Sequence, residues 1–144
     1  MDIRPLSPDY AVSPQILPED IAAIAQAGFT TVICNRPDTE VPGDLAAAAL
    51  RPVVEAAGMV FVVNPVIGGG ALTQENVDDQ RAAIDGAMGK VLAYCASGNR
   101  SSIVWALALA GRQPTDTLID ACTPYGYQVG QFRDVIETLA AKAG

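Results

Sequence analysis

The sequence contains no histidine. This absence excludes catalysis by Ser-His-Asp or Cys-His groups, and it excludes the usual metal sites that mix histidine with carboxylates. Long apolar runs are also absent, because the longest, 103–110, is far shorter than the roughly 20 residues that a membrane-spanning helix needs. We therefore predict no membrane span, no metal ion and no cofactor, so any reactive side chain has to be activated without an imidazole.

Basic residues are scarce. Lys and Arg number 9 against 16 Asp and Glu, which gives a net charge of −7. A surface of this charge repels a phosphate backbone, so nucleic acid is not an expected partner. The first residues lack the charged start and the continuous apolar segment of a secretory signal, and we predict a cytoplasmic location.

Cysteine is present in an odd number, three, and no two cysteines form a C-x-x-C pair. This pattern argues against a disulfide framework and against a zinc knuckle, so reduced thiols are expected. Cys34 and Cys122 are interpreted as small buried apolar residues. Cys95 differs from them because of the residues that follow it.

The length of 144 residues, half of them hydrophobic, suits one packed core, and we predict a single domain, 1–144. Predicted strands lie at 10–12 (a short edge strand), 29–34, 59–63 and 90–95, and predicted helices at 18–27, 44–57 with a kink or split at Pro52, 73–87, 101–110, 115–122 and 128–142. Strands that alternate with helices predict an α/β fold with a mostly parallel sheet flanked by helices. Ligands of such sheets bind at the carboxyl ends of the strands, where Cys34, Asn64 and Cys95 emerge.

Four features meet in the segment from Cys95 to Ser101. Cys95 ends an apolar strand, Gly98 lets the backbone curl so that successive N–H groups converge, and a helix begins near Ser101 with its positive dipole end toward the same place. Arg100 adds a planar cation that can bind an oxyanion through two hydrogen bonds. All four favour the thiolate form of Cys95, and we predict that Cys95 is the nucleophile of an enzyme whose loop binds an oxyanion.

The residues around the predicted nucleophile have supporting roles. The backbone amides expected to bind substrate belong to Ala96, Ser97, Gly98 and Asn99. Ser101 or Ser102 can donate a hydrogen bond to the sulfur or assist its departure in a second step, and the sequence leaves the choice open. Trp105 is expected in the core, while Tyr125 and Tyr127 lie in a loop that can wall the pocket.

The segments 13–20, 32–38, 68–70 and 94–101 together resemble the beta-lactamase-hydrolase-like phosphatase-like domains of bacteria, a family also described as sulfur transferases. The resemblance covers most of the chain. It implies the fold of dual-specificity protein tyrosine phosphatases, with Cys95 as nucleophile and Arg100 binding the substrate oxyanion.

The sequence departs from this pattern in the loop and in the acid. It has C-x4-R after Tyr94 where such phosphatases have C-x5-R, usually after a histidine, and Ala96 stands where family members often carry an arginine. The shorter loop is similar to that of rhodanese sulfurtransferases. The phosphatase fold usually supplies a general acid from the loop that here spans 64–71, and this loop contains no carboxylate.

Asp38 is the preferred substitute for the general acid, and Asp44 is the second choice. Arg36 is predicted either as a second contact to the oxyanion or only as the partner of Asp38. The leading function is a cysteine-dependent phosphatase-like hydrolase that acts on a small-molecule or phosphorylated substrate. The alternatives are a sulfurtransferase, which takes sulfur from a persulfide donor onto Cys95, and a non-catalytic anion-binding module.

Overall fold

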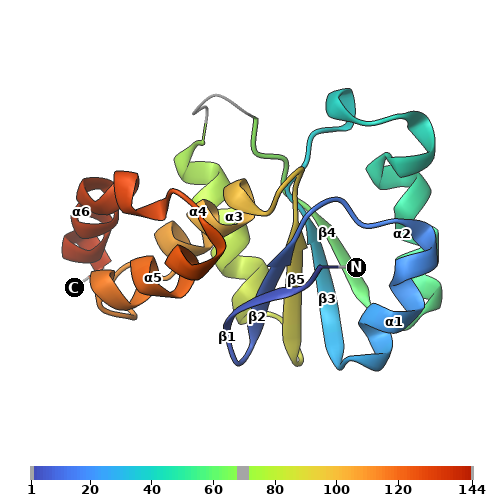
Figure 1. The fold of residues 1–144 in the computed structure, drawn as a ribbon, viewed down its shortest axis with the longest axis horizontal. Coiled ribbons are helices and arrows are strands. Elements are labelled where there is room, and N and C mark those ends of the chain that lie inside the picture. The colour runs from blue at the N-terminus through green and yellow to red at the C-terminus, as the bar shows by residue number, and fades with distance from the viewer. Residues whose placement is uncertain (1, 68–71, 144) are drawn as a thin grey trace.

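A five-stranded sheet forms the centre of the computed structural model, which describes residues 2–67 and 72–143 (Figure 1). The strands are β1 (Arg4–Ser7), β2 (Tyr10–Ser13), β3 (Phe29–Cys34), β4 (Val60–Val63) and β5 (Lys90–Tyr94). Their order in the sheet is β1-β2-β5-β3-β4, with β1 antiparallel to β2 and the other neighbours parallel. The predicted α/β fold with a mostly parallel sheet is confirmed.

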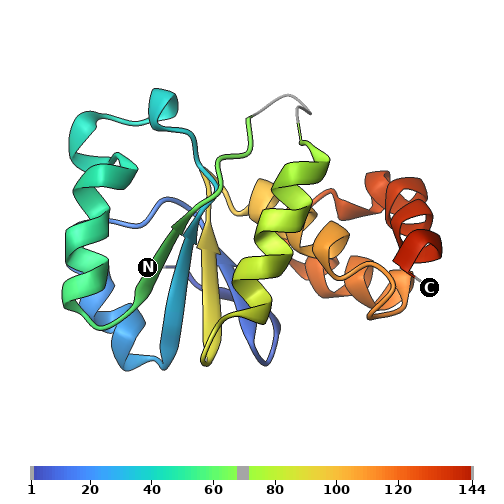
Figure 2. The same ribbon diagram turned by 180° about the vertical axis from the view of Figure 1, so that it is seen from behind.

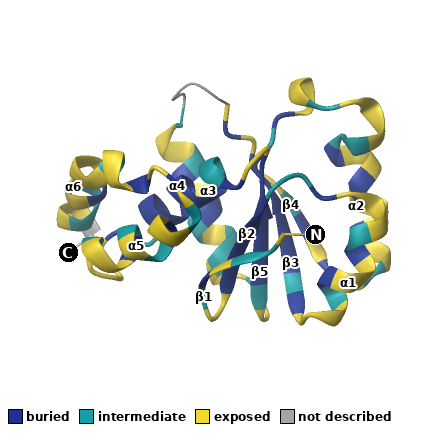
Figure 3. Ribbon diagram, in the orientation of Figure 1, coloured by how far each residue is buried: buried dark blue, intermediate teal, exposed yellow. Residues whose placement is uncertain are grey.

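Helices cover both faces of the sheet, as Figures 1 and 2 show from opposite sides. One face carries α1 (Ile21–Gln26), which follows a 3-10 turn at Pro18–Asp20, and α2 (Ala47–Ala56). The other face carries α3 (Gln74–Asp85), α4 (Asn99–Ala108), α5 (Thr115–Cys122) and α6 (Arg133–Ala143). Because both faces are covered, the central strands are mostly apolar, and Figure 3 shows β2, β3 and β5 largely buried.

Alternate residues of the central strands feed two separate cores. Val32 and Leu92 pack with α1 and α2, whereas Ile33 and Ala93 pack with α3 to α6. α4 is the most deeply buried helix, with every residue from Ser101 to Ala108 buried. The helix that starts at the end of β5 is therefore anchored along its length, and its first turn cannot shift without disturbing the core.

Two predicted elements differ from the structure. The segment 10–12 is not an edge strand, because β2 lies between β1 and β5. The edge strand is β1, which the sequence analysis did not predict because it contains Pro5, a residue tolerated on edge strands. The predicted helix at 44–57 is divided, but not at Pro52. α2 continues through Pro52, and the chain breaks instead at Ala46, whose extended ψ of 157° separates α2 from the preceding 3-10 turn.

The glycine loop at 68–70 lies outside the described residues. Within 2–67 and 72–143, no helix combines the length and the apolar character needed to cross a lipid bilayer.

Candidate active site

The carboxyl ends of four parallel strands meet at one edge of the sheet. Tyr94, the last residue of β5, is in register with Ser13 of β2 and with Cys34 of β3, which is itself in register with Val63 of β4. The residues that follow these strands therefore emerge side by side. Cys95 occupies the central position among them, as expected for a ligand site of this fold class.

The loop after β5 curls around the sulfur of Cys95. Gly98 adopts a left-handed conformation with φ of +95°, and its N–H donates a hydrogen bond of 3.0 Å to Cys95 Sγ. α4 starts directly afterwards at Asn99, so Arg100 lies in its first turn, where the sequence placed the start near Ser101. The expected tight turn is present, one loop amide contacts the sulfur, and Cys95 itself is fully buried.

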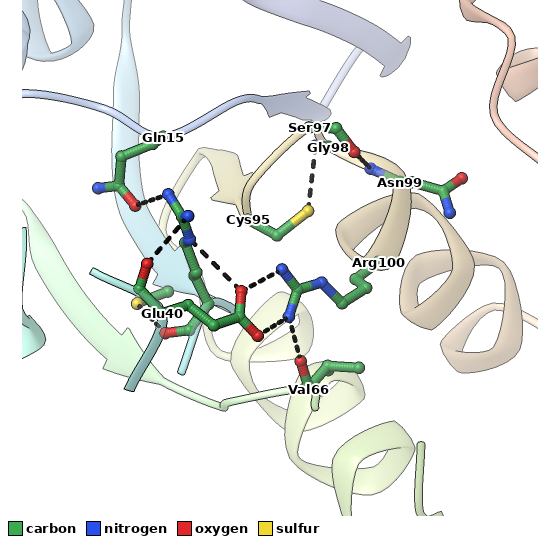
Figure 4. Close-up of polar contacts among 10 residues, drawn as sticks. Gln15, Glu40, Val66, Cys95, Ser97, Gly98, Asn99 and Arg100 are labelled. Carbon is green, nitrogen blue, oxygen red and sulfur yellow. Dashed lines mark hydrogen bonds and ion pairs between the residues drawn. The ribbon is translucent and has the colours of Figure 1, made fainter. Parts of the chain in front are cut away.

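The guanidinium of Arg100 is bound to a carboxylate that the sequence analysis missed. Its two terminal nitrogens donate to the two carboxylate oxygens of Glu40 over 2.8 and 2.7 Å, and Nη1 also donates to the carbonyl oxygen of Val66 over 2.7 Å (Figure 4). This paired contact lowers the pKa of Glu40 and raises that of Arg100. The carboxylate stands where the fork of Arg100 would bind a planar or tetrahedral oxyanion.

Arg36 also contacts Glu40. Its Nε lies 3.5 Å from Glu40 Oε1, and Nη2 donates to the backbone oxygen of Glu40 over 3.1 Å, while Nη1 donates to Gln15 Oε1 over 3.3 Å. The partner of Arg36 is thus Glu40, and the predicted pairing with Asp38 is not formed. The Nε atom is buried without a hydrogen-bond partner, which leaves a donor directed at the carboxylate.

Asp38 accepts a hydrogen bond from the backbone of α2. Its Oδ1 receives the N–H of Ala47 over 2.9 Å, so the carboxylate satisfies a free amide at the start of this helix. Asp44, the second choice, is exposed in the 3-10 turn Gly43–Leu45. A general-acid role for Asp38 stays a prediction. The carboxylate that contacts Arg100 is that of Glu40.

The two serines after Arg100 direct their hydroxyls away from the sulfur. Ser101 Oγ donates to Asn35 Oδ1 over 2.9 Å, and Ser102 Oγ donates to the carbonyl oxygen of Gly98 over 2.8 Å. A hydroxyl has one proton, so neither serine donates to Cys95 in this arrangement. Their role toward the sulfur stays a prediction.

A buried hydrogen-bond network of amide side chains lies next to the loop after β5 and contacts the first turn of α4. Asn35 and Asn64, which directly follow β3 and β4, both donate to Gln80 Oε1 over 2.9 Å, and Gln80 donates to the hydroxyl of Tyr10 over 3.0 Å. Tyr10 donates in turn to the backbone oxygen of Ser101 over 3.0 Å. The network joins two strand ends to the first turn of α4. Its one sequence signal was an asparagine directly after each of two apolar strands.

The predicted core position of Trp105 is confirmed, whereas neither Tyr125 nor Tyr127 lines the cavity that opens beside Arg100. Trp105 is buried and stacks on Tyr10 with 5.7 Å between ring centroids. Tyr127 walls the loop, since its hydroxyl donates to the carbonyl oxygen of Ser97 over 2.9 Å and accepts from Arg4 Nη1 over 2.8 Å. The side chain of Tyr127 therefore links β1 to the loop after β5.

The other two cysteines are buried in the two cores. Burial raises the pKa of the Cys34 thiol, and it raises that of Cys122 to about 12. Both thiols are therefore neutral at physiological pH, which agrees with their interpretation as small apolar residues.

A cavity of about 360 Å³ opens beside Arg100. Its walls are mostly apolar, and its polar groups other than Arg100 are neutral amides. The residues around it are Val66, Ile67, Leu72, Asn99, Ile103, Gln128, Gln131 and Phe132.

The chain has the fold of the protein tyrosine phosphatases. The crystal structure of PTPMT1 in complex with PI(5)P aligns with a TM-score of 0.76, covering 99% of both chains at 14% sequence identity, which shows the fold alone. A protein of Neisseria meningitidis that is provisionally described as a phosphatase aligns with a TM-score of 0.78 at 33% identity, covering 96% of this chain and 99% of that one.

Within this fold class, the chain belongs to the family described as the phosphatase-like domain of beta-lactamase hydrolase-like proteins, which matches residues 2–112. A beta-lactamase hydrolase-like protein of Xylella fastidiosa is 28% identical over 133 residues, which cover 91% of this chain and 31% of the relative. The chain thus spans about a third of the length of the curated relatives it matches.

Proposed function

We propose that residues 1–144 form one cysteine-dependent phosphatase domain, in which the Cys95 thiolate attacks a phosphate ester. The observation that carries this proposal is the hydrogen bond from Gly98 N to Cys95 Sγ, in a loop that leads to Arg100 in the first turn of a buried helix. N–H groups aimed at the sulfur stabilise a thiolate. The same loop offers its remaining amides and the helix dipole to a phosphoryl group.

Each part of the loop has a task in the proposed reaction. Cys95 Sγ forms a bond to phosphorus while the ester P–O bond breaks and its electron pair leaves with the oxygen of the alcohol. The loop amides that do not contact the sulfur and the guanidinium of Arg100 bind the phosphoryl oxygens, whose charge grows at the transition state. A water molecule then cleaves the phosphocysteine and releases phosphate.

The proposed substrate is a small phosphate monoester or another phosphorylated molecule with a largely uncharged leaving group. The cavity of about 360 Å³ beside Arg100 supports this size and chemistry, because apolar side chains and neutral amides form its walls. Among the described residues, this lining offers no cation beyond Arg100 for a second anionic group of the substrate.

The test is hydrolysis of nitrophenyl phosphate by the wild type, by Cys95→Ser and by the matched variant Cys34→Ser. We expect Cys95→Ser to abolish turnover and Cys34→Ser to retain it, because Cys34 lies in the core on the α1–α2 side of the sheet. Rapid acid quench followed by mass spectrometry should find phosphate on Cys95. Full turnover by Cys95→Ser would refute covalent catalysis and leave anion binding as the better description.

A second candidate is sulfur transfer through a persulfide on Cys95. It is favoured by the short C-x4-R spacing and by Asn64, an amide that enters the buried network at the strand end where phosphatases carry their acid. Transfer of sulfane sulfur needs no proton for a departing alkoxide. Incubation with thiosulfate or glutathione persulfide, followed by mass spectrometry, separates the two: a stable persulfide on Cys95 without hydrolysis of any aryl phosphate selects the transferase.

A further inference from the structure

Phosphate monoesters of ordinary alcohols require a proton donor for the leaving oxygen, and the sites expected to supply it are occupied otherwise. Asn64 stands at the end of β4, and its amide donates to Gln80 and to the backbone of Asn76. The carboxylate of Asp38 accepts from Ala47 N. Among the described residues, the carboxylate that contacts Arg100 is that of Glu40.

We propose that Glu40 is the general acid of this site, first held by Arg100 and then released by the incoming phosphoryl group to protonate the leaving oxygen. This inference rests on the proposed phosphatase function. In the structure the carboxylate occupies both hydrogen-bonding arms of Arg100 (Figure 4), and the proposed nucleophile Cys95 is fully buried. A substrate must displace Glu40 to reach the guanidinium, and the displaced side chain then lies beside the reacting group.

Displacement also changes the acidity of Glu40 in the direction that catalysis needs. The charged groups that contact its carboxylate are Arg100 from α4 and Arg36 from the loop after β3, and the thiol of Cys95 adjoins Arg100. The hydrogen bonds from Arg100 keep the pKa of Glu40 low in the free protein. Once the phosphoryl dianion takes these bonds, the carboxylate loses its strongest partner and faces negative charge, and both changes raise its pKa.

The proton balance of the step is complete. Glu40 takes a proton from solvent as the dianion displaces it, and it gives this proton to the ester oxygen as the P–O bond breaks and the S–P bond forms. The carboxylate that results can accept a proton from the water that later attacks the phosphocysteine. The free enzyme is restored when phosphate leaves and Glu40 releases this proton to solvent as its carboxylate returns to Arg100.

The segment that carries Glu40 is anchored at both ends, so its side chain can move while its backbone stays. Arg36 Nη2 holds the backbone oxygen of Glu40 over 3.1 Å, and the bond between Asp38 and Ala47 ties the start of the same 3-10 turn, Asp38–Glu40, to α2. Arg36 and Asp38 are therefore positioning residues for Glu40. Within residues 36–40, the contacts of Arg36 and Asp38 thus both serve to hold Glu40 in place.

The experiment compares the full chain as wild type, Glu40→Gln, Glu40→Asp and the matched control Glu55→Gln, which replaces an exposed glutamate of α2. Each is assayed for kcat on an alkyl phosphate and on nitrophenyl phosphate, whose phenolate leaves without a proton. Glu40→Gln should slow the alkyl ester by about 10²-fold or more and the nitrophenyl ester by less than about fivefold. Glu40→Asp should recover part of the loss, and Glu55→Gln should change neither rate.

The pH profile provides a second readout. With the alkyl ester, kcat of the wild type should fall at alkaline pH as the donor loses its proton, and this limb should be missing from the residual activity of Glu40→Gln. Equal effects of Glu40→Gln on both esters, or faster turnover of both, overturn the assignment and make Glu40 only a competing anion. Wild-type protein that hydrolyses neither ester and forms no phosphocysteine refutes the proposed function itself, which is a distinct result.

Discussion

Replacing Gly98 by alanine adds a Cβ to the loop residue whose N–H donates to the sulfur of Cys95. The backbone φ at this position is +95°, and an ideal Cβ would lie 2.2 Å from the hydroxyl oxygen of Tyr127 and 2.9 Å from its Cζ. Two penalties therefore combine: a left-handed backbone that L-residues disfavour, and a collision with a ring held by hydrogen bonds to Ser97 and Arg4.

The size of each penalty can be estimated separately. The left-handed conformation costs a residue with a Cβ roughly 1–2 kcal/mol. Displacing the Tyr127 ring breaks its two hydrogen bonds, which adds about 1.5 kcal/mol for a partly buried group. Gly98→Ala should then lower the free energy of unfolding by about 3 kcal/mol, which corresponds to a drop in Tm of about 12 °C for a chain of this size.

Gly58→Ala is the matched control for the backbone penalty. Gly58 has φ of +88° at the end of α2, and an added Cβ there has no atom within 4 Å. Only the conformational cost applies, so we expect a loss of about 1.5 kcal/mol and a drop in Tm of about 6 °C. Differential scanning calorimetry measures both variants, and guanidinium unfolding gives the free energies.

The double variant Gly98→Ala/Tyr127→Ala isolates the collision. Removing the ring leaves room for the new Cβ, so the double variant should be more stable than the sum of the two single losses predicts, by about 1 kcal/mol or more. Strict additivity, or equal losses for Gly98→Ala and Gly58→Ala, would show that Tyr127 does not close the loop as described.

Further predictions concern the charged groups of the site and its thiol. Iodoacetamide should alkylate Cys95 much faster than the other two cysteines near neutral pH, and phosphate should protect it; peptide mapping with equal rates at all three would remove the case for an activated thiol. Arg100→Lys should weaken phosphate binding by about tenfold in calorimetric titration, since an ammonium cannot form the paired planar contact. Asp38→Asn keeps an oxygen for the amide of Ala47 but removes the acid, so it should leave the ratio of alkyl to nitrophenyl turnover unchanged; a selective loss of the alkyl reaction would return the general-acid role to Asp38. The pKa of Glu40 is lowered from an ordinary value of 4.5, so its ion pair stabilises the fold above that pH and the contribution disappears as pH falls through the lower folded value. The unfolding midpoints of wild type and Glu40→Gln should therefore differ slightly at neutral pH and converge in acid, and a difference that persists in strong acid would contradict the ion pair.

Much of the scaffold was predictable because it depends on local patterns. The β-branched run at 29–34 became β3 without a change in its bounds, and Thr73 caps α3 by accepting the N–H of Asn76. The loop from Cys95 to Arg100 was found for a similar reason, since its sharp turn needs glycine and its helix start follows directly. The edge strand β1 was missed because Pro5 and short length hide the pattern of a strand.

The partners of the charged side chains were not predictable in the same way. Arg36 was assigned to Asp38 or to the substrate, yet it contacts Glu40, and Asp38 holds α2 instead. All three lie within five residues, so sequence distance could not rank the pairings. The folded loop decides them, because it places Asp38 at the first amide of α2 and Glu40 beside Arg36.

The sequence by itself determined that a thiol, a glycine turn and an arginine stand together at the end of a buried strand, because residues 95–100 are close in the chain and need no other contact to meet. Only the tertiary structure decided what surrounds them. The register of β2 and β3 beside β5, and of β4 beside β3, brings Gln15, Arg36 and Val66 to the same edge. This arrangement sets Glu40, 60 positions before Arg100, against the guanidinium. Contacts of such separation follow from packing of the whole sheet, which no local pattern encodes.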